Sequence, residues 1–475
     1  MKKMSLCIGL SFSLLVINCM AQDLVATPAG IRVKEVIELL NGTSSYKLED
    51  YISNQYAPGF RDAFPMEAHK GIFQTTQTMF GKVSVVEIKN STQHKINIVL
   101  KSEKKDAWLN LNLDVEPGEP YRIVSIGLRP GPPPATDRND KDLSFSNLDE
   151  LDQYLFKKSK GNEFSGAIMI AKNGNPVFKE AYGFASKEND IPNKIDTKFN
   201  LGSINKIFTT VAITQLIEKG KLSIDDPIGN YLDMFPKDIA EKVTIRHLLN
   251  MRSGWGDYWA NKYYLANKDQ IRTVSDYIKF IKDIPLDFEP GTNFQHCNIG
   301  YEIAGAIIEK ISRMDYYDYI KKNIYDVAGM NLSESYFRNE SVENLATGYT
   351  NLTPQGQTSR AFQSNNLDML PLRGTPAGGG YSTIGDLLKF DKALRSGELL
   401  NAKYTQYVIS RFNGSPGDQH SPPSKPFRVA GRAPGVVTFL GLDFQSSYSI
   451  ILLSNYDQDV ASDLADEIIN MLGIG

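Results

Sequence analysis

A serine and a lysine three residues apart can form a nucleophile and its base, and this spacing occurs three times in the chain. The pairs are Ser44 and Lys47, Ser102 and Lys105, and Ser203 and Lys206. On a helix, residues three apart share one face with β-carbons about 5–6 Å apart, so the amine can reach the hydroxyl. The same spacing also arises from an ordinary helix cap followed by a solvated lysine. The surroundings of each pair must therefore decide.

The third pair stands at the start of an apolar-periodic run. Apolar residues recur at helical spacing from Ile204 to Ile217, and Gly220 follows as a stop, which predicts a buried helix. Ser203 would lie in its first turn, where unpaired N–H groups and the helix dipole stabilise negative charge. Lys206 would lie on a buried face and lose hydration, which favours the neutral amine that can act as a base. We therefore expect Ser203 and Lys206 to be catalytic.

Five further segments follow this pair at positions that suggest a known family. They are KLSIDDPIGNYL at 221–232, VTIRHLLNMRSGW at 243–255, EPGTNFQHCNIGYEIAGAIIEK at 289–310, ATGYT at 346–350 and TPAGGGYSTIGDLLKF at 375–390. Together with SINK at 203–206, the chain resembles the serine β-lactamase and penicillin-binding protein family over 145–475. It is most similar to the branch of class C β-lactamases, esterases and D-aminopeptidases. The resemblance implies a serine hydrolase with a Ser203 acyl-enzyme and Lys206 as base.

The family's second motif, Tyr-x-Asn, is changed to His296-Cys297-Asn298. By resemblance, the Asn298 amide would hold the substrate carbonyl and Lys206. The tyrosine that passes a proton to the leaving group has become His296. An imidazole with an ordinary pKa of about 6.5 can do that work near neutral pH, so His296 is a catalytic candidate. A purely structural histidine is the equal alternative.

The third motif, Lys- or His-x-Gly, is changed to Val429-Ala430-Gly431. Gly431 is kept, so the strand can still approach the substrate closely, and the resemblance places the oxyanion hole at the N–H groups of Ser203 and Arg432. Main-chain donors are indifferent to side-chain replacement. The missing cation is the one that meets the substrate carboxylate in β-lactam-binding members, and Arg428 and Arg432 are the candidates to replace it. The change disfavours β-lactam and D-Ala-D-Ala cleavage and favours ester or uncharged amide substrates, peptides included.

These departures leave a second function open, that of a catalytically degenerate β-lactamase-fold binding or scaffold protein. A thiol nucleophile at Cys297 beside His296 is a weaker rival, because adjacent residues seldom point at one another; a buried wall cysteine is the preferred interpretation. The aromatic run DYWANKYY at 257–264 fits the rim of the cleft or the core of a helical lobe better than a sugar platform.

Charge and histidine spacing narrow the range of partners. Lys and Arg number 52 against 55 Asp and Glu, and without a basic surplus a nucleic-acid partner is not expected. The five histidines are scattered without ligand spacing, so we expect neither a metal site nor a cofactor. A small-molecule or peptide substrate remains, and the sequence leaves the oligomeric state open.

The first residues have the pattern of a secretory signal peptide. Lys2 and Lys3 precede an apolar stretch, and small residues at Cys19 and Ala21 predict cleavage after Ala21, a segment too short to span a membrane. We therefore expect an exported protein, periplasmic or secreted, that is not integral to the membrane. A lipoprotein anchored through Cys19 is the less favoured alternative, since Asn18 is a poor residue before it.

The remaining sequence divides into two domains. Helical patterns at 28–40, 48–55 and 66–79 and strand patterns at 83–89, 96–101, 108–115 and 121–128 predict a small α+β domain over 22–129. This domain resembles the small α+β domains found ahead of such hydrolases, which implies one curved antiparallel sheet. Residues 130–143 form a Pro-rich linker. The domain over 144–475 has a hairpin at Asn173-Gly174, a strand pair within 436–455 and a closing helix from Val460. Strands at both ends of this domain with helices between them predict one antiparallel sheet, closed by the two ends and flanked by helices, plus a helical lobe. The resemblance implies that this α+β fold is of the β-lactamase/transpeptidase type.

Overall fold

The computed structural model describes residues 27–62, 66–104, 107–131, 145–259, 261–352, 363–412, 427–457 and 460–474. The predicted signal peptide at 1–21, with Cys19, and nearly all of the predicted linker lie outside these residues. The chain divides into two compact units, Met1–Asp142 and Leu143–Gly475, and each is described by itself.

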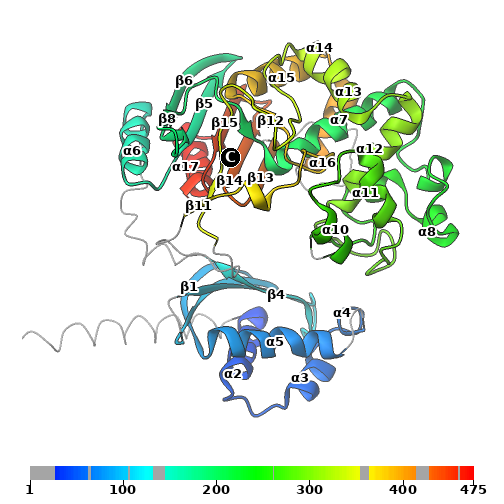
Figure 1. The fold of residues 1–475 in the computed structure, drawn as a ribbon. Coiled ribbons are helices and arrows are strands. Elements are labelled where there is room, and N and C mark those ends of the chain that lie inside the picture. Colours follow the sequence, from blue (N-terminus) through cyan, green and yellow to red (C-terminus); the bar gives the residue numbers. More distant parts are fainter. Residues whose placement is uncertain are drawn as a thin grey trace, which may run out of the picture. The chain divides into compact units, whose positions relative to one another are not determined.

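The N-terminal unit packs helices on one face of a four-stranded antiparallel sheet (Figure 1). Its elements are α2 (Pro28–Asn41), α3 (Leu48–Gln55), α4 (Pro58–Arg61), α5 (Met66–Phe80), β1 (Val83–Ser91), β2 (Lys95–Ser102), β3 (Trp108–Val115) and β4 (Ile123–Gly131), with the strands in sequence order. Leu109, Leu111 and Leu113 are buried while the residues between them are not, as strand alternation requires. Every helix and strand predicted in this unit is present, and α4 was not predicted.

The C-terminal unit contains a five-stranded antiparallel sheet built from both ends of its sequence. In spatial order the strands are β13 (Phe427–Ala433), β14 (Val436–Leu442), β15 (Tyr448–Ser454), β5 (Gly166–Lys172) and β6 (Asn175–Tyr182). The β5–β6 hairpin turns at Asn173 and Gly174, whose φ angles are 52° and 71°, the left-handed conformation that an Asn-Gly turn favours. The predicted α+β fold with a sheet joined by the two ends is confirmed.

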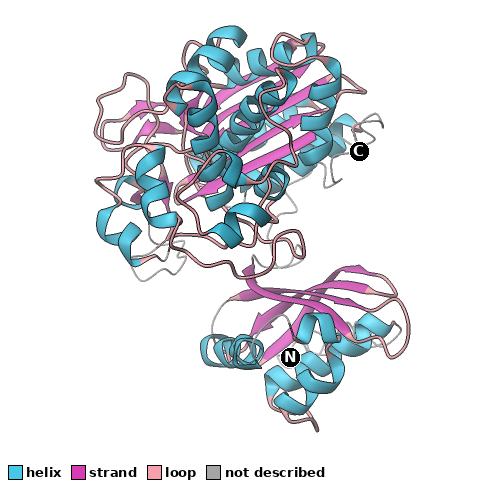
Figure 2. Ribbon diagram, turned by 90° about the vertical axis from the view of Figure 1, so that its right-hand side faces the viewer, coloured by secondary structure: helices cyan, strands magenta, loops and turns pink. Residues whose placement is uncertain are grey.

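Helices cover both faces of this sheet (Figure 2). Alternation along β5 divides the two cores: Ile168 and Ile170 face α6 (Leu148–Lys160) and α17 (Val460–Leu472), whereas Ala167 and Met169 face the core that holds α7 (Lys206–Glu218), α15 (Ile384–Ser396) and α16 (Ala402–Phe412). Because α7 is buried on nearly all sides, its first turn is fixed firmly against the sheet.

The helical lobe lies between α7 and α15 in sequence and packs on α7. Its main helices are α8 (Lys237–Lys242), α9 (Ile245–Leu249), α10 (Lys262–Asn267), α11 (Val274–Ile281), α12 (Ile299–Ser312) and α13 (Tyr316–Ile320). Short elements complete the unit: β7 (Phe184–Ser186), β8 (Ile191–Pro192), β9 (Phe199–Asn200), η1 (Gly202–Asn205), η2 (Ile228–Asn230), η3 (Lys321–Tyr325), α14 (Asp326–Ala328), β10 (Tyr349–Thr350), β11 (Ser364–Asn365), η4 (Leu367–Met369) and β12 (Tyr381–Ser382). The apolar helix α12 packs against α7, α9 and α11, which brings its first residue beside the start of α7.

Within the described residues, no helix combines the length and apolar character needed to cross a membrane. In the same part of the chain, no group of three or more His, Cys, Asp or Glu side chains is placed to hold a metal ion.

Candidate active site

Ser203 lies on the tight 3-10 turn η1, directly before α7, and is half-buried. The turn is held from both sides: the Leu201 N–H donates to the Gly380 carbonyl at 2.8 Å, and the Gly202 N–H donates to Asn200 Oδ1 at 2.9 Å. Gly202 has a φ of +49°, a left-handed conformation that favours glycine. The hydroxyl is therefore presented from a fixed backbone and not from a mobile loop.

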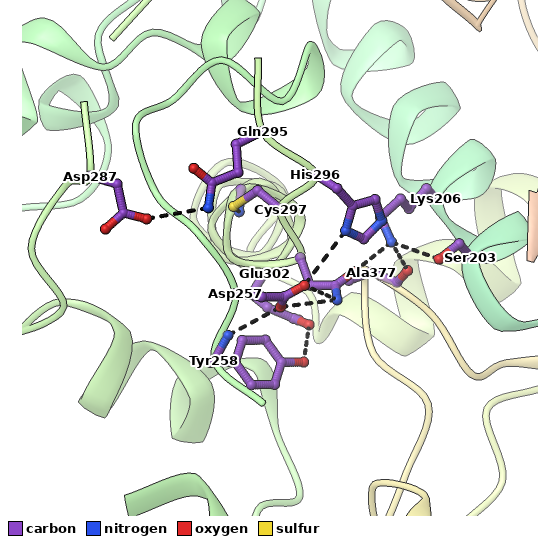
Figure 3. A network of polar contacts seen from close by, with 12 residues as sticks. Ser203, Lys206, Asp257, Tyr258, Asp287, Gln295, His296, Cys297, Glu302 and Ala377 are labelled. Atoms are coloured by element: carbon purple, nitrogen blue, oxygen red, sulfur yellow. Dashed lines mark hydrogen bonds and ion pairs between the residues drawn. The ribbon is translucent and has the colours of Figure 1, made fainter. Parts of the chain in front are cut away.

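Lys206 is buried, and its amine makes three hydrogen bonds with oxygens (Figure 3). Nζ lies 3.1 Å from Ser203 Oγ, 2.6 Å from Asn298 Oδ1 and 2.6 Å from the Ala377 carbonyl oxygen. The two carbonyl oxygens can only accept, so they take two N–H bonds of the amine. In the neutral amine this leaves the lone pair for the Ser203 hydroxyl, which is the arrangement a general base requires. The predicted pair is thus brought together inside the protein.

Asn298 stands at the N-cap position of α12, and its side chain bridges Lys206 to a carboxylate that was not predicted, that of Asp257. Its Nδ2 donates to both oxygens of Asp257, at 3.1 and 3.0 Å, while its Oδ1 accepts from Lys206. A carboxylate accepts and does not donate, so Asp257 fixes which end of the amide faces the lysine. Of the two contacts that the resemblance implied for the Asn298 amide, the one to Lys206 is present.

Asp257 belongs to the loop between α9 and α10, and its neighbour anchors that loop in the lobe. The Tyr258 hydroxyl bonds Glu302 Oε1 at 3.0 Å, and both side chains are buried. Glu302 lies one turn after Asn298 on α12, and burial raises the pKa of its carboxyl to about 8. Neither acid was predicted, because a lone Asp in an aromatic run and a lone Glu in an apolar helix give no pattern that indicates a site.

His296 lies at the exposed edge of this cluster. Its side chain is 57% exposed, and Nδ1 is 3.6 Å from Asp257 Oδ2. Figure 3 shows the ring with its Nδ1 edge toward that carboxylate. The histidine that replaces the family's tyrosine therefore lies beside the carboxylate that accepts hydrogen bonds from Asn298.

Gly431 on β13 lies directly against the serine turn. A Cβ at this position would come within 2.1 Å of the Leu201 carbonyl oxygen and 2.9 Å of the Ser203 nitrogen, so a side chain does not fit. A Cβ at Gly202 would in turn lie 3.0 Å from the Arg432 nitrogen. The main-chain nitrogens of Ser203 and Arg432 thus lie on two closely packed backbone segments, where the resemblance implied two donors to a developing oxyanion.

The two arginines considered as replacements for the missing cation have their side chains on the same face of β13, opposite to that of Val429 and Gly431. Residues alternate along β13: Val429 is buried in the core on the α7 side, whereas Arg428 is half-exposed on the other face. Arg428 Nη1 lies 4.0 Å from Asp466 of α17, the helix that covers the face away from α7. Arg428 is therefore not at the site, and the Arg432 side chain lies on the same face as that of Arg428, so Arg432 brings its main-chain nitrogen to the serine turn and not its charge.

Cys297 is fully buried, and burial raises the pKa of its thiol to about 12. Such a thiol is almost entirely protonated at neutral pH, and the thiolate is the reactive form. This favours the wall-cysteine interpretation.

The aromatic run at 257–264 contains both buried and exposed rings. Tyr258 and Tyr264 are in the core of the lobe, while Trp259 and Tyr263 are exposed.

Several known proteins are similar to this chain in sequence or in fold. The profile of the family described as Beta-lactamase matches residues 147–471. Penicillin-binding protein 4* of Bacillus subtilis (strain 168) is 29% identical over 334 residues, which are 65% of this chain and 72% of that protein. The crystal structure of a penicillin-binding protein from Bacillus halodurans, 29% identical, matches with a TM-score of 0.58 over 66% of this chain and 99% of its own. A D-amino acid amidase from Ochrobactrum anthropi SV3 shares the fold alone, at 22% identity and a TM-score of 0.57 over 69% of this chain and 99% of its own.

Proposed function

The chain belongs to the beta-lactamase family, and from this premise we propose that it is an exported serine hydrolase that cleaves an ester or uncharged amide bond through an acyl-enzyme on Ser203. The observation that carries the proposal is the 3.1 Å contact between Lys206 Nζ and Ser203 Oγ, made by a buried amine that also donates to two carbonyl oxygens.

The reaction begins with transfer of the Ser203 proton to Lys206 as Oγ attacks the substrate carbonyl. The negative charge that develops on the carbonyl oxygen is stabilised by the N–H groups of Ser203 and Arg432. Collapse of the tetrahedral intermediate breaks the bond to the alcohol or amine, which leaves with a proton from a general acid, for which His296 is the candidate. Water then attacks the acyl carbon and gives one proton back to that acid, and Ser203 Oγ recovers its own proton from Lys206 as the carboxylic acid is released.

The substrate class follows from the residue at the third motif. Val429 is buried and apolar, so it offers no charge to a substrate carboxylate, and Arg428 is turned to the other face of the strand. A substrate that carries a carboxylate next to the scissile bond would lose its ion pair here. Neutral esters and uncharged amides, peptide bonds included, do not depend on that pair.

Acylation of Ser203 is the direct test. The chain from Gln22 onward is treated with a fluorophosphonate probe and with a chromogenic short-chain ester, and the labelled peptide is identified by mass spectrometry. We expect a label on Ser203 and ester turnover that Ser203→Ala abolishes. Ser44→Ala is the matched control, because Ser44 and Lys47 have the same spacing on the surface. Equal labelling of wild type and Ser203→Ala contradicts the proposal and leaves the degenerate binding protein as the remaining function.

Export is tested separately. Cells expressing the full chain are fractionated, and the N-terminus of the product is sequenced. We expect a soluble exported product that begins at Gln22. A cytoplasmic product that retains Lys2 and Lys3 contradicts export without affecting the chemistry at Ser203.

A further inference from the structure

We propose that Asp257 is the positioning residue that makes His296 the proton donor to the leaving group. The inference rests on the proposed function and deepens it. A single carboxylate lies 3.0 Å from Asn298 Nδ2 and 3.6 Å from His296 Nδ1, so it faces the side chains of both residues that flank Cys297 in the second motif.

The backbone around this carboxylate is held in place on both sides. On the Asp257 side, Tyr258 is buried with its hydroxyl on Glu302, and Gly256 is packed so closely that a Cβ would lie 2.7 Å from Asp287 Oδ2 and 2.8 Å from Gln295 Nε2. On the His296 side, the Gln295 N–H donates to the Met251 carbonyl at 3.0 Å. The two segments are thus bonded to each other beside the Asp257–His296 contact, which keeps the carboxylate and the ring together.

The contact with Asp257 determines which nitrogen of His296 transfers a proton to the leaving group. A neutral imidazole has one N–H, and a carboxylate facing Nδ1 holds that hydrogen on Nδ1. Nε2 is then the nitrogen left to exchange a proton with the leaving group. Lys206, Glu302 and Cys297 are further ionisable groups of this cluster. Lys206 contacts Ser203, Asn298 and Ala377, and Glu302 and Cys297 are buried.

The proton balance closes over one turnover. In acylation, Lys206 takes the Ser203 proton, the bond to the leaving group breaks, and His296 Nε2 gives one proton to the departing oxygen or nitrogen. In hydrolysis, water gives one proton to His296 Nε2 as its oxygen bonds to the acyl carbon, and Ser203 Oγ recovers the proton held by Lys206. The carboxylate of Asp257 orients the ring and touches no reacting atom.

The test uses two esters that differ only in the leaving group. A nitrophenolate leaves without a proton, whereas an alkyl alkoxide needs one. Asp257→Asn keeps an oxygen that can accept from Asn298 but loses the charge that faces His296. We expect this variant to lose about 10- to 100-fold in kcat/KM for the alkyl ester and less than about 3-fold for the nitrophenyl ester. The matched control is Asp287→Asn, since Asp287 contacts Gln295 and not His296; its ratio of the two rates should equal that of wild type.

A second background separates positioning from folding. His296→Tyr introduces the side chain that the family uses, and a phenol does not need a carboxylate at Nδ1. We expect Asp257→Asn to leave the rate ratio unchanged in that background. Equal losses on both esters, or a ratio in His296→Ala equal to that of wild type, would overturn the inference. A failure of the proposed function is distinguishable, because Ser203→Ala would then hydrolyse both esters as well as wild type.

Discussion

Gly431 lies so close to Ser203 that a methyl group on the glycine would come within 2.9 Å of the serine nitrogen. The strand that carries Gly431 and the turn that carries the nucleophile therefore form one rigid unit. Thr438 of the next strand adds to it by donating from Oγ1 to the Leu201 carbonyl at 2.8 Å.

Gly431→Ala tests this unit. The added Cβ meets the Leu201 oxygen at 2.1 Å, so strand and turn must separate and the N–H groups of Ser203 and Arg432 move apart. We expect kcat for ester hydrolysis to fall about 10²- to 10³-fold, as when an oxyanion donor is lost. Gly385→Ala is the control, because its nearest neighbour is an ordinary contact at 3.7 Å. Full activity in Gly431→Ala would place the oxyanion donors elsewhere.

Lys206→Met tests the base. Methionine fills nearly the same buried space but has no lone pair on nitrogen, so packing is largely kept while proton transfer from Ser203 is lost. We expect the rate of Ser203 labelling by a fluorophosphonate to fall about 10²- to 10⁴-fold, with a small change in melting temperature. Lys47→Met, the lysine of the surface pair, should label at the wild-type rate. Rapid labelling of Lys206→Met would show that another group takes the serine proton.

The sequence predicted those parts of the site that carry local patterns. Ser203 and Lys206 stand at the start of an apolar-periodic run with a glycine stop, and hydrophobic periodicity is the most dependable sequence signal of a helix. Asn298 and Gly431 were located by their place in motifs. For these four residues the expected neighbours are the observed ones.

The sequence did not predict the carboxylates behind the site. Asp257 reaches Asn298 across 41 residues of sequence, and a contact of that range depends on how α12 packs in the lobe. The position of Arg428 could not be predicted either. Alternation along a strand predicts that neighbouring residues face opposite ways, but which face lies beside the nucleophile depends on how the sheet packs.

Glu302→Gln tests the buried acid through the pH dependence of stability. Burial raises the pKa of Glu302 to about 8 from an ordinary value of 4.5. Between these values the folded protein holds a proton that the unfolded chain releases. The free energy of unfolding therefore falls as pH rises, by at most about 1.4 kcal/mol per pH unit from this group.

Glutamine cannot ionise, and its carbonyl oxygen still accepts from Tyr258. From pH 5 to pH 8 we expect the denaturation midpoint of wild type to fall relative to that of Glu302→Gln. The difference between the two midpoints should be largest at pH 8. The exposed Glu241→Gln of α8 should follow the wild-type curve. Parallel curves for Glu302→Gln and wild type would mean that Glu302 ionises in the folded protein as easily as in the unfolded chain.

Val429→Lys tests the proposal that the substrate carries no carboxylate next to the scissile bond. Val429 occupies the position of the family's cation, on the face of β13 that it shares with Gly431. A lysine there would pair with a carboxylate next to the scissile bond. We expect a fluorescent penicillin to label Val429→Lys at Ser203 and to leave wild type weakly labelled or unlabelled. Val429→Met, similar in length but uncharged, should behave as wild type.

Because position 429 is buried, the ammonium of Val429→Lys loses hydration, and we expect the melting temperature of this variant to be lower by several degrees. If Val429→Lys keeps its ester activity and is still not labelled by the penicillin, the missing cation does not explain why wild type is labelled weakly or not at all.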